Sequence, residues 1–193
     1  QAPATLLFDD FLRVYFSCRP PADINSQYVS YSAYVDLDRT NLFKVHSIAK
    51  QPILNLGGLG EFDEFGTYPV SVIRDGDEVR AYYAGWTRCE SVPFNVAIGA
   101  AVSRNNGETF EKIGNGPVLS YSPDEPFVLS GPKVRRFNGQ WQLFYIAGRK
   151  WKMVDGKAEP VYKIRMATST DGIYWHKLDR DLIESRIEED EAQ

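Results

Sequence analysis

The chain reads YPVSVIRDGDEVRAYYAGW from Tyr68 to Trp86. Residues 68–74 show an alternation of apolar and polar side chains and are rich in β-branched residues. This pattern is typical of a strand with one buried face. The run Asp75-Gly76-Asp77 predicts a hairpin turn, because Asp-Gly readily supplies the positive φ angles that tight turns need. Residues 79–86 then predict a second strand that pairs with the first.

The pattern continues beyond Trp86. A longer loop at residues 87–94 leads to a predicted strand at 95–103. The turn Asn105-Asn106-Gly107 leads to a short strand at 109–113. Residues 68–113 therefore predict a unit of four short antiparallel strands.

This unit recurs along the chain. Pro3, Pro69 and Pro132 open three copies about 65 residues apart, and a fixed period of this kind indicates an array of similar supersecondary units. Each copy closes on an aromatic residue: Phe43, Phe110 or Trp175. The other predicted strands lie at 132–137, 141–147, 161–169 and 174–178 in the last copy, and at 6–8, 12–17, 28–35 and 43–46 in the first.

Four short strands per unit predict an all-β fold, a β-propeller of four-stranded antiparallel blades, three of them in this chain. We predict a single, incomplete propeller domain over residues 1–193, with repeats at about 1–60, 61–121 and 122–185, and residues 186–193 as the start of a further blade or a tail. The turns at 103–110 and 169–175 resemble the Asp-box hairpins of many propellers, whose role is structural. Three blades leave two open edges, so we expect either about two more blades or partner chains to close the ring.

Composition excludes several classes of partner. The 193 residues are 43% hydrophobic and 13% aromatic, with a net charge of −4 and no basic stripe, so we expect no nucleic acid partner. No apolar run approaches the ~18 residues of a membrane-spanning helix. Cys18 and Cys89 are predicted to be free, buried or half-buried thiols, which favours a reducing, cytoplasmic compartment. Gln1 is not a natural start, so we expect a missing N-terminal segment and leave export open.

Acidic residues precede the second and third predicted blades and recur near the end of the sequence. Asp63 stands before Pro69, Asp124 and Glu125 before Pro132, and Glu191 where a fourth lead-in segment would begin. Carboxylates brought together from different blades repel, so one has a raised pKa and acts as an acid while another stays ionised, as glycoside hydrolysis requires. The alternative is structural: Asp63 caps a turn, and the other two lie in a solvated loop.

Long loops on a rigid scaffold commonly carry function, and the loops at 18–27, 87–94 and 148–160 share one predicted face with the lead-in segments. Exposed Trp stacks on sugar rings, and Arg holds hydroxyls or an anionic substituent. Packing of Trp between blades and pairing of Arg19 and Arg149 with the acids are the alternatives. The candidate substrate contacts are Arg19, Glu64, Tyr68, Trp86, Arg88, Ser130, Arg149 and Trp151.

Motifs for other chemistries are missing. The sequence holds no metal-spaced His/Cys cluster, no phosphate-binding P-loop, no G-x-S-x-G and no glycine-rich dinucleotide motif. We therefore expect no metal and no cofactor, and treat His46 and His176 as structural.

The order and spacing of these segments resemble the five-bladed β-propeller superfamily of glycoside hydrolase families 43, 32, 62, 68 and 130, and most closely bacterial family 43-like propellers of unassigned activity. The resemblance covers nearly the whole chain. It is carried by residues 12–17, by 62–66 with Pro69, by 82–86, by 97–103, and by 162–167 through 171–172 to Trp175.

The resemblance implies three acids on three blades: a base, a pKa-tuning Asp and a general-acid Glu. Asp63 best matches the acid of the second blade, Asp124 or Glu125 that of the third, and Glu191 a fourth-blade contribution. The Trp-Met-Asn-Asp-Pro, Arg-Asp-Pro and Glu-Cys signatures of the fructosidase branch are absent, and a first-blade acid would lie before Gln1.

The leading hypothesis is a carbohydrate-active enzyme, a glycoside hydrolase with carboxylates at the mouth of the propeller channel. The alternative is a non-catalytic sugar-binding or scaffold propeller in glycan assembly. Carboxylates that are tied up by arginine would favour the second.

Overall fold

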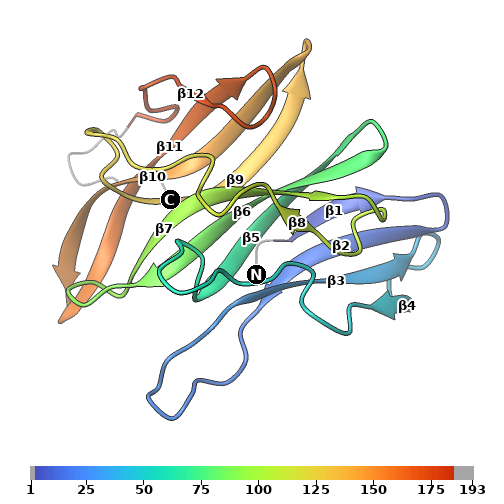
Figure 1. Ribbon diagram of the computed structural model, residues 1–193, viewed down its shortest axis with the longest axis horizontal. Coiled ribbons are helices and arrows are strands. Elements are labelled where there is room, and N and C mark those ends of the chain that lie inside the picture. The colour runs from blue at the N-terminus through green and yellow to red at the C-terminus, as the bar shows by residue number, and fades with distance from the viewer. Residues whose placement is uncertain (1–2, 185–193) are drawn as a thin grey trace.

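The computed structural model describes residues 3–184 and contains three separate four-stranded antiparallel sheets. Blade 1 has the strand order β1-β2-β3-β4, blade 2 has β5-β6-β7-β8, and blade 3 has β9-β10-β11-β12 (Figure 1). The strands are β1 (Ala4–Leu7), β2 (Phe11–Cys18), β3 (Tyr31–Asp38), β4 (Val45–Ile48), β5 (Gly66–Asp75), β6 (Glu78–Arg88), β7 (Phe94–Ser103), β8 (Glu111–Lys112), β9 (Phe127–Phe137), β10 (Gln140–Val154), β11 (Lys157–Ser169) and β12 (His176–Lys177).

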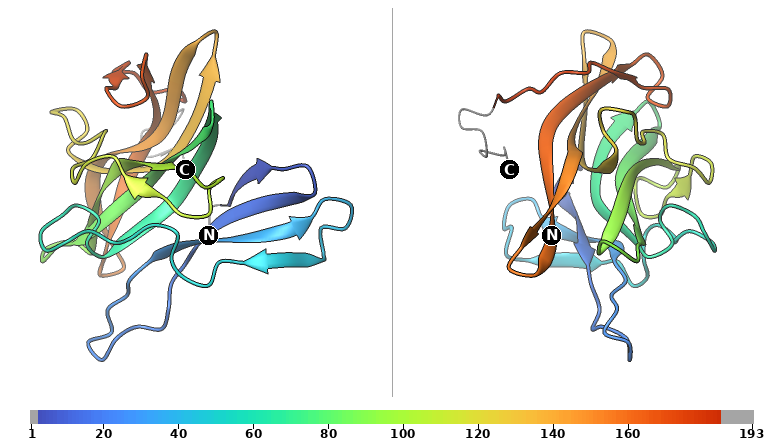
Figure 2. Two further views of the ribbon diagram at one scale, coloured as in Figure 1. Left: turned by 45° about the vertical axis from the view of Figure 1, so that its right-hand side comes forward. Right: turned by 90° about the vertical axis from the view of Figure 1, so that its left-hand side faces the viewer.

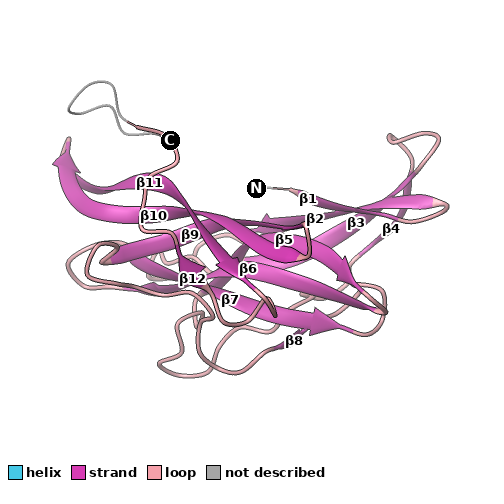
Figure 3. Ribbon diagram, turned by 90° about the horizontal axis from the view of Figure 1, so that it is seen from above, coloured by secondary structure: helices cyan, strands magenta, loops and turns pink. Residues whose placement is uncertain are grey.

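The predicted all-β propeller of four-stranded blades is confirmed. The described part of the chain contains only strands, turns and loops (Figure 3). The three blades follow one another in sequence order, with blade 2 between the other two (Figure 2). No helix within residues 3–184 could cross a membrane.

The predicted loop at residues 148–160 is wrong. Strands β10 and β11 continue through this segment as one long hairpin, which turns at Asp155 and Gly156, both with positive φ. A shift in strand register between Gly148 and Lys150 lets the hairpin continue past the glycine. A Cβ at Gly148 would lie 2.5 Å from the carbonyl oxygen of Phe127, so the glycine allows close packing of strands.

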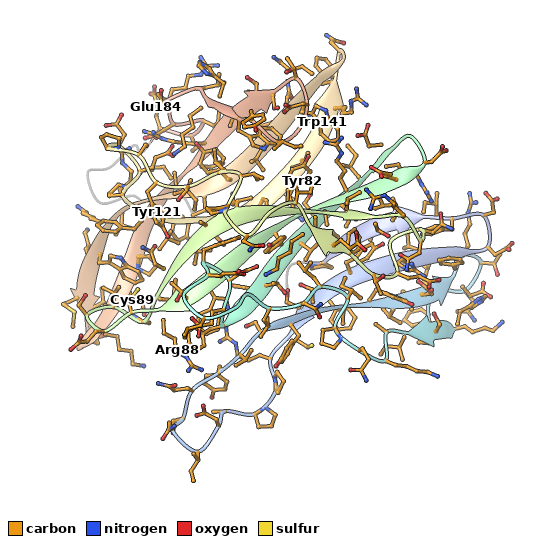
Figure 4. The ribbon with its side chains drawn as sticks, viewed as in Figure 1. Tyr82, Arg88, Cys89, Tyr121, Trp141 and Glu184 are labelled. Carbon is orange, nitrogen blue, oxygen red and sulfur yellow. The ribbon has the colours of Figure 1, made fainter. Side chains whose placement is uncertain are left out.

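The core lies between neighbouring blades. Tyr15 and Leu6 of blade 1 pack with Val79 and Ala81 of blade 2. A second cluster joins blades 2 and 3, where Tyr82 faces Trp141, as the side chains of Figure 4 show. Burial of these apolar faces holds the blades in order.

Blades 1 and 2 each also hydrogen-bond to the turn before the last strand of the next blade. Tyr15 Oη donates to the Gly107 carbonyl at 2.9 Å, and Tyr82 Oη donates to the Gly172 carbonyl at 2.9 Å. Both glycines have positive φ, and a Cβ on either would lie 2.5 Å or less from the tyrosine oxygen. We call these two contacts the blade latches.

The predicted structural role of the two Asp-box-like turns agrees with these contacts. Asp171 Oδ1 accepts from the backbone amides of residues 173 and 174, which lowers the pKa of Asp171. Phe110 packs edge-on against Tyr15, and Trp175 packs edge-on against Tyr82. Phe43, the closing aromatic of blade 1, is fully exposed, because no described blade covers that side.

Candidate functional site

Three connections meet at one end of the blades: the β2–β3 loop, the β6–β7 loop and the tip of the β10–β11 hairpin. They lie together at the lower left of Figure 1, away from the two Asp-box-like turns. Both cysteines belong to this end, and they are free, as predicted, but exposed rather than buried. We call this end the loop face.

The loop face contains a cavity of about 410 Å³ between blades 1 and 2. It brings together three of the predicted contact residues, Arg19, Trp86 and Arg88, of which Arg88 is seen at the end of β6 in Figure 4. The remaining lining residues are Ser26, Gln27, Tyr28, Cys89, Pro93, Phe94 and Val96. The sequence interpretation missed Tyr28 and Phe94, although their positions at the ends of two predicted loops were a usable signal.

Arg88 is held in a fixed position. Its Nη2 donates to the Tyr28 carbonyl at 2.9 Å, and its Nη1 donates to the Gln27 side chain. The guanidinium carbon lies 4.1 Å from the centre of the Phe65 ring. Contacts to both blades therefore fix this positive charge at the cavity wall.

Arg19 approaches the same wall from blade 1. Its guanidinium lies over the Tyr28 ring, 5.4 Å from the ring centre, and its Nε donates to Ser30 Oγ at 3.4 Å. Tyr28 thus links the two arginines, through its ring to Arg19 and through its carbonyl to Arg88. Its side chain is 46% exposed, so part of the ring is open to a ligand.

Trp86 is mostly buried. Its indole lies against Gly66, where a Cβ would lie only 1.8 Å from Nε1, and only 9% of the residue is exposed. Nε1 has no hydrogen-bond partner within residues 3–184. Trp86 therefore contributes an edge to the cavity wall and packs mainly with Phe65 and Val128.

Five other predicted contacts do not line this cavity. Trp151 packs edge-on against Phe94, with ring centres 5.5 Å apart, and Tyr68 belongs to the same apolar cluster. Glu64 accepts from the Gly60 amide, and Ser130 lies in β9 opposite Ile146. Arg149 donates to the Asp124 carbonyl at 2.7 Å, so within residues 3–184 it pairs with the backbone and not with a carboxylate.

Asp63 does not reach solvent. It is 0% exposed, and its Oδ2 accepts from Tyr83 Oη at 2.9 Å and lies 2.6 Å from Lys112 Nζ. Its Cβ packs onto Gly85 of β6, where an added Cβ would lie 2.4 Å away. Asp63 thus ties the segment that leads into blade 2 to the second and fourth strands of that blade.

Glu125 has the same arrangement in blade 3. It is 0% exposed, and its Oε1 accepts from Tyr145 Oη at 2.9 Å and from Arg165 Nη1 at 3.1 Å. Its Oε2 forms an ion pair with Lys177. Both acids therefore have a structural role, and a catalytic role for either stays a prediction.

The remaining predicted catalytic residues differ from these two. Asp124 is exposed, and its carbonyl is the acceptor of the Arg149 bond. Glu191 lies outside the described residues. Within residues 3–184, no group of three His, Cys, Asp or Glu side chains is arranged to hold a metal ion.

The buried acids also affect their tyrosine partners. Burial, together with the Asp63 carboxylate, raises the pKa of Tyr83 far above its usual range. Burial and Glu125 do the same to the pKa of Tyr145. Both phenols are therefore neutral hydrogen-bond donors at ordinary pH.

No family model matches the chain. Two uncharacterized proteins of Mycobacterium tuberculosis, MT1551 of strain CDC 1551 and Rv1502 of strain H37Rv, are each 35% identical to it over 171 residues. These residues make up 89% of this chain and 54% of either relative, so the chain spans about half the length of the curated relatives it matches.

Solved structures with the same fold include glycoside hydrolases. The family 32 β-fructofuranosidase BmSUC1 of Bombyx mori has a TM-score of 0.67 at 17% identity, over 96% of this chain and 35% of that one. Zg3597, a family 117 glycoside hydrolase of Zobellia galactanivorans, has a TM-score of 0.67 at 14% identity, over 95% and 47%. A protein of Bacteroides thetaiotaomicron described as a "putative glycosidase" has a TM-score of 0.66 at 17% identity, over 96% and 53%. These likenesses show that the chain has the propeller fold of such enzymes, while membership of family 43 stays a prediction.

Proposed function

We propose that this chain is part of a carbohydrate-active protein and that the loop-face cavity binds a glycan. The observation that carries the proposal is the joining of Arg19, Arg88 and Tyr28 around one cavity, where loops of two blades meet on a scaffold of the glycoside hydrolase type. A volume of about 410 Å³ falls within the range of small-ligand sites.

The cavity wall offers the groups that a sugar needs. Guanidinium N–H groups donate to hydroxyl oxygens, and aromatic faces pack on the apolar C–H faces of sugar rings. Arg19 and Arg88 supply the donors, and Tyr28 and Phe94 supply the rings. Because the Arg88 contacts exist without a ligand, little conformational entropy is lost when a ligand binds.

A glycan-array screen of the full-length protein tests this proposal. Tyr28→Ala and Arg88→Ala should each weaken binding to any glycan that is found by about tenfold or more, because each removes a wall of the cavity. Arg104→Ala, at the opposite end of blade 2, is the matched control and should leave binding unchanged. Full binding by both cavity variants would place the glycan elsewhere and refute the proposal.

Glycoside hydrolysis is the second candidate, favoured by the hydrolase fold of the similar structures. The proposed acids are Asp63, Asp124, Glu125 and Glu191. Asp124 is the informative one among those described, because it is exposed, whereas Asp63 and Glu125 are held in ion pairs. Loss of turnover in a folded Asp124→Asn protein would support hydrolysis, and full activity of Asp63→Asn and Glu125→Gln would remove those two from the mechanism.

We further propose that more blades, from the rest of the protein or from partner chains, complete a five-bladed ring. Phe16 and Phe144 support this. Each follows or precedes a tyrosine that is buried between described blades, Tyr15 or Tyr145, so each points to the opposite face of its blade, where it is only half-buried. Gel filtration of the full-length protein distinguishes a closed monomer from an assembly of chains.

A further inference from the structure

We propose that the ligand of the loop-face cavity carries an anionic group, either a uronic acid carboxylate or a phosphate ester, which Arg19 and Arg88 bind. This inference rests on the proposed function, because it assumes that the cavity holds a sugar. It adds the chemical class of that sugar.

The charge of the cavity wall is the first observation. The lining residues include two arginines and no Asp or Glu. Some arginines elsewhere have carboxylate partners, since Arg13 pairs with Asp36 at 2.7 Å and Arg165 pairs with Glu125 and Asp181. Others, such as Arg74, donate to a backbone carbonyl. In the part of the chain that the structure describes, neither Arg19 nor Arg88 has such a partner.

Unused donors are the second observation. A guanidinium has five N–H groups, and Arg88 uses two of its nitrogens for Gln27 and Tyr28. Arg19 donates only through Nε, so both of its amino nitrogens lack a partner within residues 3–184. These amino groups have the fork geometry that binds carboxylate or phosphate oxygens in a bidentate manner.

Two acids in the loops of this face, Asp23 and Glu90, do not line the cavity. Asp23, in the same loop as Gln27, accepts from the backbone amides of Asn25 and Gln27 at 2.9 Å. Glu90 follows Cys89 but lines a separate cavity between the β6–β7 loop and the β10–β11 hairpin. The two arginines thus leave a local excess of positive charge that an anionic ligand would neutralise.

The test uses pairs of probes that share a sugar and differ in whether it carries an anionic group. Isothermal titration of the full-length protein compares an oligogalacturonide with its fully methyl-esterified form, which keeps the sugar but removes the carboxylate charge. Glucose 6-phosphate and glucose form the second pair and distinguish phosphate from carboxylate as the bound group.

We expect the charged member of one pair to bind at least about tenfold more tightly than its neutral partner. This preference should fall as NaCl rises from about 50 to 500 mM, since salt screens exposed charges. Arg19→Gln and Arg88→Gln should each reduce the preference severalfold, and Arg104→Gln should leave it unchanged. Arg88→Lys should keep part of it, because lysine retains the charge but loses the fork.

The outcomes separate the two proposals. If neutral sugars bind in the cavity as tightly as charged ones, the anionic inference is wrong and the proposed function stands. If the glycan screen and both probe pairs show no binding that depends on Tyr28 or Arg88, the proposed function fails, and this inference fails with it.

Discussion

Blades 2 and 3 each bury one acid in the same place, but with different side chains and partners. In blade 2, Asp63 is bound by Tyr83 and Lys112. In blade 3, Glu125 is bound by Tyr145, Arg165 and Lys177. The tyrosines lie on the second strand of each blade and the lysines on the fourth.

The difference between the two blades has a steric cause. Arg165 pairs in register with Tyr145, and the equivalent partner of Tyr83 is Gly99. The space above Gly99 is occupied by Phe62, whose ring stacks on Tyr83. In blade 2 the ring of Phe62 occupies this position beside the tyrosine, and in blade 3 Arg165 occupies it.

Blade 1 lacks this arrangement. Phe16 stands at the position of Tyr83, and Ile48 stands at the position of Lys112. The acid, its tyrosine and its lysine therefore occur together in blades 2 and 3. This grouping is what a structural clamp between a lead-in segment and its blade requires.

The largest expected effect comes from Glu125→Ala. It removes the carboxylate that faces Arg165 and Lys177, and loss of one partner of a buried ion pair typically costs about 3–5 kcal/mol. Chemical denaturation measures the free energy of unfolding, with exposed Glu108→Ala as the control. A loss below about 1 kcal/mol would show that the clamp contributes little.

Gly99→Ala tests the steric part of the comparison. Its Cβ would lie 2.4 Å from Tyr83 Cζ and 2.8 Å from Phe62 Cζ, so we expect a loss of about 1–3 kcal/mol from overpacking. Because Phe62→Ala opens the space beside Gly99, the loss of stability in the double variant should be smaller than the sum of the two single losses. If the losses simply add, the two residues do not share that volume.

Alkaline pH tests the tyrosines of the clamps. Their pKa values are raised in the folded state, so the unfolded state ionises first, near pH 10, and stability falls as pH rises further. By pH 11 each such tyrosine should cost about 1.4 kcal/mol. Burial also raises the pKa of Tyr82 to about 12. Denaturation of Tyr83→Phe and Tyr145→Phe at pH 8 and 11 should show a smaller pH-dependent loss than the parent, and an unchanged loss would contradict this account.

The smallest effect is expected at the blade latches. Tyr15→Phe and Tyr82→Phe each remove one hydrogen bond to a glycine carbonyl, for a loss of about 0.5–1.5 kcal/mol. Phe144 already stands at the equivalent position of blade 3, so Phe144→Tyr provides a control that should not destabilise the described blades. Equal stability of all three variants and the parent would remove the latches from the account.

Much of the fold could be predicted because each repeat contains residues that mark the ends and the order of its strands. Asp75 and Gly76 ended a strand, and the aromatic pairs marked the second strand of each blade. The β10–β11 hairpin could not be predicted, because Gly148 and Pro160 normally interrupt strands. Here the glycine fits against the Phe127 backbone, and the proline pairs with Trp151 beyond a bulge.

The candidate site was predicted only in part. The spacing placed acids before blades 2 and 3, but sequence spacing does not show whether a carboxylate faces a channel or a lysine. Lys112 and Lys177 are 65 residues apart and Asp63 and Glu125 are 62 apart, so both pairs follow the repeat approximately, and this was a usable signal for an ion pair. Arg19 and Arg88 were found from loop length, whereas their link through Tyr28 depends on how the loop folds back.

We propose that the buried acids hold the fold, whereas the loop-face arginines bind the ligand. Glu125→Gln and Arg88→Gln in the full-length protein test it directly, with unfolding free energy and glycan affinity measured on the same samples. We predict that Glu125→Gln lowers stability and leaves the affinity of the folded protein within about twofold, while Arg88→Gln lowers affinity about tenfold and changes stability by less than about 1 kcal/mol. A Glu125→Gln protein that is as stable as the parent but no longer binds or cleaves the glycan would contradict the account.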